Sequence, residues 1–212
     1  MRALLITILL ASPAYAGTNE VTLGNAVRTL KSSSANALTD DSLATGRLAY
    51  ARDVGLAFTP RLRLLVEGAL TFGGVQGTMF QTITTDVSTV GLLVGARAEY
   101  AIYDRVTAGA RLDLGSGYAD LTLTQDGHSA SDSRWGGIVD AALGIDALAV
   151  QRRRFSFGVR FELGYAIQHV PALAPTRDGG DPSAIKLEMM AASIGHLDLD
   201  GPWFGFSMFS QF

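Results

Sequence analysis

Residues 154–167, Arg-Phe-Ser-Phe-Gly-Val-Arg-Phe-Glu-Leu-Gly-Tyr-Ala-Ile, alternate large apolar residues with small or charged ones. A repeat of two residues predicts a β-strand with one face of each kind. In a strand of a soluble protein, the polar face usually carries long hydrophilic side chains that reach into water. Here the charges share their face with glycine, serine and alanine, which indicates that this face is crowded. Lipid against the apolar face and a narrow interior against the other would explain both.

The same alternation recurs along the chain and predicts further strands. Two of these segments, 21–30 and 46–58, alternate less regularly than the rest. Arg52 falls on the apolar face of the second one, so we expect a bulge there or a position near lipid headgroups. The segments with the alternation, in addition to 154–167 and the end of the chain, are 21–30, 46–58, 61–73, 89–102, 106–115 and 139–148.

The links between these segments alternate in length. Short links fall at residues 59–60, 103–105 and 151–153, and longer polar links fall at roughly 31–44, 74–87, 124–134 and 169–195. Short turns on one side and long loops on the other are typical of membrane-spanning β-barrels, with the turns in the periplasm and the loops outside.

The N-terminus predicts export. Met1-Arg2 is a short basic start, Ala3 to Ala11 is an apolar run too short to span a bilayer, and Ala14-Tyr15-Ala16 places small residues at the cleavage positions. We therefore expect a signal peptide over 1–16, with cleavage at Ala14, Ala16 and Gly17, and a barrel over 17–212. Apart from this segment, no run of about twenty apolar residues predicts a transmembrane helix.

Composition narrows the function classes. The 212 residues contain no cysteine, which excludes disulfides, thiolate catalysis and cysteine-ligated metals. The formal net charge is −3, so no electrostatic argument favours nucleic acid. Mean hydropathy is +0.23, which is high for a secreted soluble domain. An exported, hydrophobic chain with no spanning helix predicts a closed β-barrel, because only a closed barrel satisfies every backbone hydrogen bond in lipid.

The chain ends Trp-Phe-Gly-Phe-Ser-Met-Phe-Ser-Gln-Phe over residues 203–212. Phe204, Phe206, Met208 and Phe212 share one face, and this looks like the closing strand of Gram-negative outer-membrane barrels. The mature chain resembles the small eight-stranded family that includes the OmpA transmembrane domain and OmpX. The resemblance implies an outer-membrane location, contact with outer-membrane lipid, and a C-terminal aromatic read by the barrel-assembly machinery. It implies no particular function, because such barrels serve as scaffolds, adhesins, pores and lipid-modifying enzymes.

The number of strands has more than one solution. Residues 185–199 could form a further strand before Gly201-Pro202, which would give nine strands in all and leave the two termini on opposite sides of the membrane. We favour eight, with 169–195 as an external loop and the last strand beginning near Leu197 and kinking at Gly201-Pro202. The alternatives are a tenth strand or a barrel without 21–30. A soluble lipocalin-type barrel is a competing fold, which would require the Phe155–Ile167 apolar face to point inward.

Charged residues on the non-lipid faces predict an ion-paired interior. Eight strands enclose a lumen that side chains can fill, so these charges should pair and plug it. The alternative is a gated ion path in which they set selectivity. The residues are Arg63, Glu67, Arg97, Glu99, Arg111, Asp113, Asp140, Asp146, Arg160 and Glu162.

Catalytic signals are confined to one loop. His128 and Ser131 partly resemble the His-x-Ser-Asn pattern of barrel-borne lipid deacylases, but the serine comes one position late and no asparagine follows. We assign no catalytic residue, cofactor or metal. The sequence favours a membrane scaffold or surface-interaction protein that uses its external loops, for which an extracellular ligand is a candidate partner. A narrow pore for ions or small solutes is second, and a lipid-modifying enzyme is third.

Overall fold

The computed structural model describes residues 18–32, 35, 38–39, 41–55, 59, 61–79, 81–153, 155–177 and 195–212. No helix in these ranges is long and apolar enough to cross a membrane. The strands are β1 (Asn19–Thr29), β2 (Ser42–Asp53), β3 (Leu62–Met79), β4 (Ile83–Tyr103), β5 (Val106–Gln125), β6 (His128–Arg152), β7 (Phe155–Leu173), β8 (Thr176–Arg177), β9 (Gly195–Asp198) and β10 (Gly201–Gln211).

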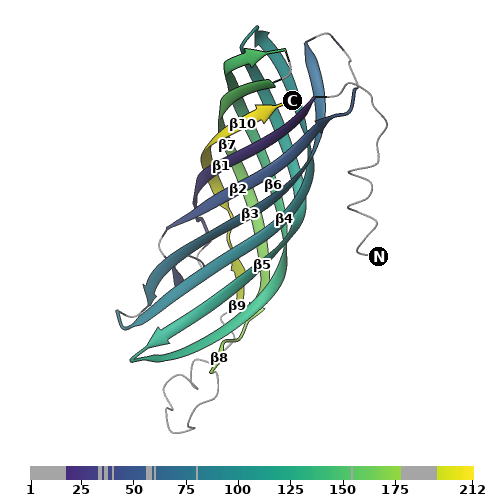
Figure 1. Cartoon of the computed structure of the whole chain (residues 1–212). Coiled ribbons are helices and arrows are strands. Elements are labelled where there is room, and N and C mark those ends of the chain that lie inside the picture. The colour runs from purple at the N-terminus through teal and green to yellow at the C-terminus, as the bar shows by residue number, and fades with distance from the viewer. Residues whose placement is uncertain are drawn as a thin grey trace.

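Eight of these strands close into an antiparallel barrel (Figure 1). Each of β1 to β7 pairs with its neighbour in sequence, and β10 pairs with both β7 and β1. The two ends of the barrel chain meet where the N–H of Asn19 donates to the carbonyl of Phe212 at 2.9 Å. The eight-stranded expectation is confirmed. The ten-stranded alternative is wrong, because β8 and β9 add only short pairings to β6 and β7 and β1 is part of the ring.

The last barrel strand is interrupted. β9 and β10 both pair with β7, with a gap at Leu199 and Asp200 between them. The expected start of the last strand near Leu197 is confirmed, since β9 contains this residue and pairs with β7 there in the same register as β10. The expected kink at Gly201-Pro202 stays a prediction. The expected external loop at 169–195 is too long at its beginning, because β7 continues to Leu173.

Apolar side chains cover the outside of the barrel in a belt. They include Leu23, Val27, Leu48, Val66, Leu70, Phe72, Val90, Leu92, Val94, Leu112, Leu114, Val139, Leu143, Ile145, Phe161, Leu163, Tyr165, Ile167, Phe204, Phe206 and Met208, all exposed. The lipocalin-type alternative is wrong, since the apolar face of β7 points outward and Arg160 points inward.

The long strands β3 to β6 continue beyond this belt and form an extension, at the lower left of Figure 1. We define the extension as residues 74–79, 83–89, 119–125 and 128–134. Its strands pair in register, for example Thr84 with Thr124 and Thr122 with Ser131. The loops expected at 74–87 and 124–134 are therefore wrong: the polar residues that suggested loops lie mostly on paired strands. The second reverses through Asp126 and Gly127, both at positive φ, as two-residue hairpin turns require.

The chemistry of the two faces is exchanged where the belt meets the extension, although the same alternate residues continue to point inward. Along β4, Val90 and Leu92 face outward and Arg97 and Glu99 inward, whereas nearer the tip Val87 is buried and Ser88 is exposed. The inner side of the extension thus holds an ordinary hydrophobic core. Its buried residues are Leu30, Ala35, Leu38, Leu43, Val75, Ile83, Val87, Ala119, Leu121, Leu123, Val170, Leu173, Leu197 and Leu199. The loop expected at 31–44 contributes Ala35 and Leu38 to this core.

Candidate functional site

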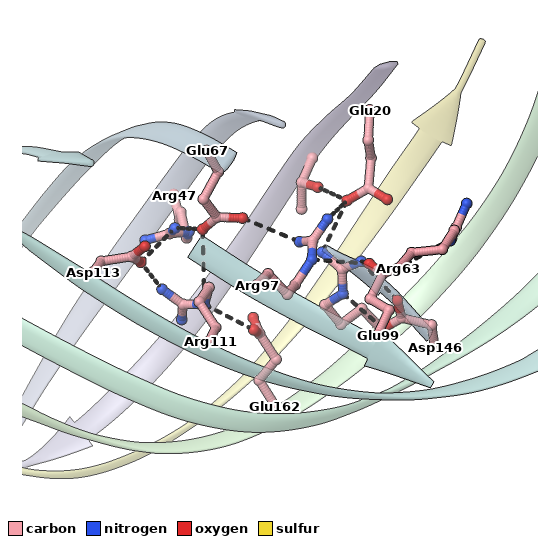
Figure 2. A network of polar contacts seen from close by, with 12 residues as sticks. Glu20, Arg47, Arg63, Glu67, Arg97, Glu99, Arg111, Asp113, Asp146 and Glu162 are labelled. Atoms are coloured by element: carbon pink, nitrogen blue, oxygen red, sulfur yellow. Dashed lines mark hydrogen bonds and ion pairs between the residues drawn. The ribbon is translucent and has the colours of Figure 1, made fainter. Parts of the chain in front are cut away.

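The interior of the belt is filled by a continuous network of ion pairs (Figure 2). At the end with the short turns, Arg97 contacts three carboxylates: Glu20 at 2.5 Å, Glu67 at 3.2 Å and Glu99 at 2.9 Å. Arg160 contacts Glu20 at 3.0 Å and Glu99 at 3.4 Å. Two arginines from different strands thus share the same two carboxylates.

The network continues toward the extension through Arg111. Its guanidinium pairs with Asp113, with Glu162 at 3.1 Å and with Asp140 at 3.3 Å. Arg47 pairs with Glu67 and reaches Asp113 at 2.8 Å. Because Glu67 also binds Arg97, the two groups of ion pairs are joined across the lumen.

All ten residues expected to point inward take part in this network. Arg63 lies at its edge and pairs with Glu99 at 2.6 Å, and Asp146 holds Arg160 at 2.6 Å. Two further members, Glu20 and Arg47, were not among the residues predicted from the sequence. Glu20 lies one residue before the first expected strand, and Arg47 lies in the irregular segment whose outward face carries Leu48. Each of the two lies an even number of residues from inward-facing glycine or alanine positions of its own strand. That spacing could have identified both as inward-facing.

An aromatic residue closes one side of the charged layer. The indole N–H of Trp203 donates to Asp140 at 2.9 Å, and Arg111 lies over the ring at 5.4 Å from its centroid. The ring packs against Gly164, where an added Cβ would lie 2.5 Å from two ring atoms. Glycine is therefore required there by close approach.

A cavity of about 50 Å³ lies between the charged layer and the hydrophobic core. Arg28 lines it and is buried, with 8% of its surface exposed. Its guanidinium donates to the carbonyl of Leu199 at 2.9 Å and to Gln168 Oε1 at 3.3 Å. Both acceptors are neutral, and no described carboxylate lies within 4.0 Å of the guanidinium, but the negative charges of Asp140 and Asp200 act favourably on it.

The turn end of the barrel holds a wider hollow. It measures about 350 Å³ and is lined by Arg61, Arg63, Asp104, Gln151 and Gln211, among others. Beyond it the lumen meets Glu20, Glu99 and Arg160, which are at most 2% exposed. Passage along the barrel therefore meets two barriers, first the ion-paired layer and then the hydrophobic core of the extension.

The other expected site residues have varied positions. His128 is exposed at the tip of β6 and Ser131 is half-buried three residues along the same strand, a spacing that directs the two side chains to opposite faces. The cleavage residues Ala14, Ala16 and Gly17 lie outside the described ranges. Phe204, Phe206, Met208 and Phe212 are exposed on the outer face of the closing strand. Among the described residues, no group of carboxylates and histidines could hold a metal ion.

Comparison with known proteins gives distant structural likenesses. No family model and no curated protein matches. The chain is similar to outer-membrane barrels. Among solved structures, it resembles the attachment invasion locus protein Ail of Yersinia pestis, in complex with a heparin analogue (14% identity, 93% of this chain and 98% of that one, TM-score 0.44).

Two further solved structures of outer-membrane barrels are similar to this chain at low sequence identity. They are the outer-membrane protein OprG of Pseudomonas aeruginosa (12% identity, 93% and 96% covered, TM-score 0.44) and Neisserial surface protein A (10% identity, 94% and 98% covered, TM-score 0.39). These are proteins of the kind that the sequence resembles. With TM-scores below 0.5 they carry no weight for function, and the fold rests on the chain's own strand register.

Proposed function

We propose that this protein is an outer-membrane barrel, closed to solutes, that anchors its β-sheet extension at the cell surface. The single observation that supports this most strongly is the lumen, which is blocked twice by layers of different chemistry. A transport path needs an opening through both layers. A scaffold needs neither, and gains a rigid wall from them.

The belt supports the membrane part of the proposal. The belt covers 11 residues on each of three neighbouring strands: Leu62 to Phe72 on β3, Val90 to Tyr100 on β4 and Ala108 to Tyr118 on β5. The first and last belt residues of each strand pair with those of the next strand. A tilted strand crosses the hydrocarbon core with about 9–11 residues. Aromatic residues lie at the edge next to the extension, where Tyr118 and Trp135 stack edge-on at 5.5 Å, as is typical of membrane interfaces.

The ends of the belt support the orientation. Both described termini and the short turns lie at one end, which we place in the periplasm. The extension then projects from the cell. Its outward face is rich in hydroxyl and carboxylate groups, including Ser88, Asp120, Thr122 and Ser131, which suit contact with water or with a polar partner. Export through residues 1–16 and recognition of the closing strand by the assembly machinery belong to the same proposal.

Single-channel recording tests the closed lumen. The mature protein is refolded in detergent and added to a planar bilayer, and insertion is verified separately by protease protection in vesicles made from the same lipid. We expect no unitary current steps from inserted protein. Reproducible steps would overturn the scaffold and favour the narrow pore, for which the hollow at the turn end would be the entrance. The third candidate, a lipid-modifying enzyme, would require that the activity is lost in the His128→Ala variant.

A further inference from the structure

The short turns of the barrel, at the upper end in Figure 1, carry exposed arginines. Arg61 lies directly before β3, and Arg105 lies in the link between β4 and β5. Arg152 is the last residue of β6, and Arg153 follows it in the link to β7. All four side chains are exposed, and none of them forms an ion pair with a carboxylate in the described part of the chain.

The balance of charge at this end is positive. Among its described residues outside the ion-paired interior, a fifth arginine, Arg52, is half-buried near the end of β2. The negative groups are three: Asp53, which accepts a hydrogen bond from the N–H of Gly55 at 2.8 Å, the exposed Asp104, and the terminal carboxylate of Phe212. The arginines therefore outnumber the carboxylates. The extension has the opposite bias, and its charged side chains are Asp86, Asp120, Asp132 and Arg134.

The arginines lie just beyond the apolar surface of the barrel. Arg105 follows the exposed ring of Tyr103 by two residues, and Arg152 follows the exposed Val150 by two and pairs across the hairpin with the exposed Phe155. Two residues of a strand tilted by about 40° rise by about 5 Å along the membrane normal. The headgroup layer on each side of the hydrocarbon core is about 5–8 Å thick. These guanidinium groups are therefore at the depth of lipid headgroups.

The chemistry of the guanidinium group indicates the partner at that depth. Its planar set of N–H donors matches the oxygens of a phosphate group, and basic groups beside a membrane attract anionic lipids. We propose that the turn end of the barrel binds the phosphate groups of anionic phospholipids in the leaflet that surrounds it, through Arg61, Arg105, Arg152 and Arg153. The inference rests on the membrane location in the proposed function, in which this leaflet faces the periplasm.

Lipid selectivity at the protein surface tests this contact. The mature protein is refolded into phosphatidylcholine vesicles that contain a trace of spin-labelled phosphatidylglycerol or of spin-labelled phosphatidylcholine. Electron paramagnetic resonance then measures the share of each label that the barrel immobilises. We expect phosphatidylglycerol to be enriched about twofold at low ionic strength, because an attraction of about fivefold at each arginine is averaged with neutral positions around the barrel. The enrichment should fall in high salt.

A triple variant locates the contact. Arg105→Gln, Arg152→Gln and Arg153→Gln together should remove most of the enrichment, whereas Arg134→Gln, the control in the extension, should keep it. The three substituted side chains are exposed at turns, so the variant should insert like the wild type, which protease protection verifies.

Three results would overturn the inference. Equal immobilisation of the two lipids by inserted wild-type protein would mean that the arginines face water or a soluble anionic polymer. An enrichment that high salt leaves unchanged would contradict a contact between charges, and this result needs no variant. Undiminished enrichment in the triple variant would place the contact elsewhere. All three leave the closed scaffold intact, which fails separately if the wild type conducts or does not insert.

Discussion

Each central arginine of the charged layer is held by several carboxylates. Arg97 has three and Arg111 has four within 4.0 Å, counting the longer contact with Glu67 at 3.9 Å. Shared contacts of this kind offset the desolvation of each charge, which a single partner seldom does. They also couple the strands, because removing one arginine takes a partner away from carboxylates on several strands at once.

Arg97→Met should therefore destabilise the barrel strongly. Glu20, Glu67 and Glu99 would lose their common partner in a buried site, and breaking a buried ion pair typically costs about 3–5 kcal/mol. Urea unfolding in lipid vesicles measures the loss. The control is Arg134→Met, whose half-exposed guanidinium pairs with Asp132 at 3.1 Å and should contribute only about 0–1 kcal/mol. Equal losses in the two variants would show that the interior charges are not a cooperative layer.

Asp132, in the extension, gives a pH-dependent contact. Burial in itself raises the pKa of its carboxyl group. The backbone N–H groups of Ala174 and Ser133, each at 2.8 Å, and the guanidinium of Arg134 outweigh burial and hold the pKa below its ordinary value. A lowered folded-state pKa means that the carboxylate stabilises the fold above the unfolded value of about 3.9, and that this is lost as pH falls through the folded value.

The amide proton shifts of Ala174 and Ser133 should report this titration. We expect both shifts to move together with a midpoint below about 3.9, because both amides donate to the same carboxylate. Asp132→Asn should abolish the transition and leave the barrel folded. A midpoint at or above 3.9 in the wild type would contradict the hydrogen bonds as the cause.

At the scale of the strand, the same in-and-out alternation places side chains against lipid in the belt and against water in the extension. In the belt, the outward face is apolar and the inward face is charged or small, as in Leu112 and Asp113. In the extension, the inward face is apolar and the outward face is polar, as in Leu121 and Thr122. The same alternate residues of the strand point inward in both sections. Only the surroundings of the two faces differ between the belt and the extension.

Two arginine substitutions on the outward face of β4 should distinguish the lipid-facing belt from the water-facing extension. Val94 and Thr84 both point outward, the first in the belt and the second in the extension. Val94→Arg should cost about 2–4 kcal/mol, because it places a charge against hydrocarbon, whereas Thr84→Arg should cost almost nothing in water. Unfolding in vesicles measures both. A comparable loss for Thr84→Arg would mean that lipid covers the extension as well.

The sequence predicted the belt better than the extension for a physical reason. Apolar residues alternating with glycine and arginine have few explanations besides lipid, so residues such as Arg160 indicated the inward face correctly. In the extension, Thr84 and Asp86 have the composition of a loop, and pairing with Thr124 and Thr122 depends on register with a distant segment. The available signals were Ile83, Val87, Leu121 and Leu123, which alternate with those polar residues. The surroundings of Arg28 could not be predicted, because its hydrogen-bond partners come from β7 and from the break between β9 and β10.

At the scale of the whole molecule, two barriers in series close the lumen. The charged layer spans the belt, and the hydrophobic core of the extension fills the same cross-section farther along, with Val87, Leu121 and Leu173 almost fully buried. An ion that passed the first layer would meet a core that consists mainly of apolar side chains. Charged residues inside a barrel therefore do not by themselves make a channel in this molecule.

Removal of a charge from the inner layer should for this reason leave the protein electrically silent. Arg97→Met opens space beside Glu20 and Glu67, but the core of the extension stays intact. We expect neither the wild type nor this variant to give unitary steps in a planar bilayer, once insertion of each is verified by protease protection. Steps in the variant alone would mean that the charged layer is the sole gate and that the apolar core lets ions pass. The inward arginines would then be selectivity residues, and the extension would surround the mouth of a pore.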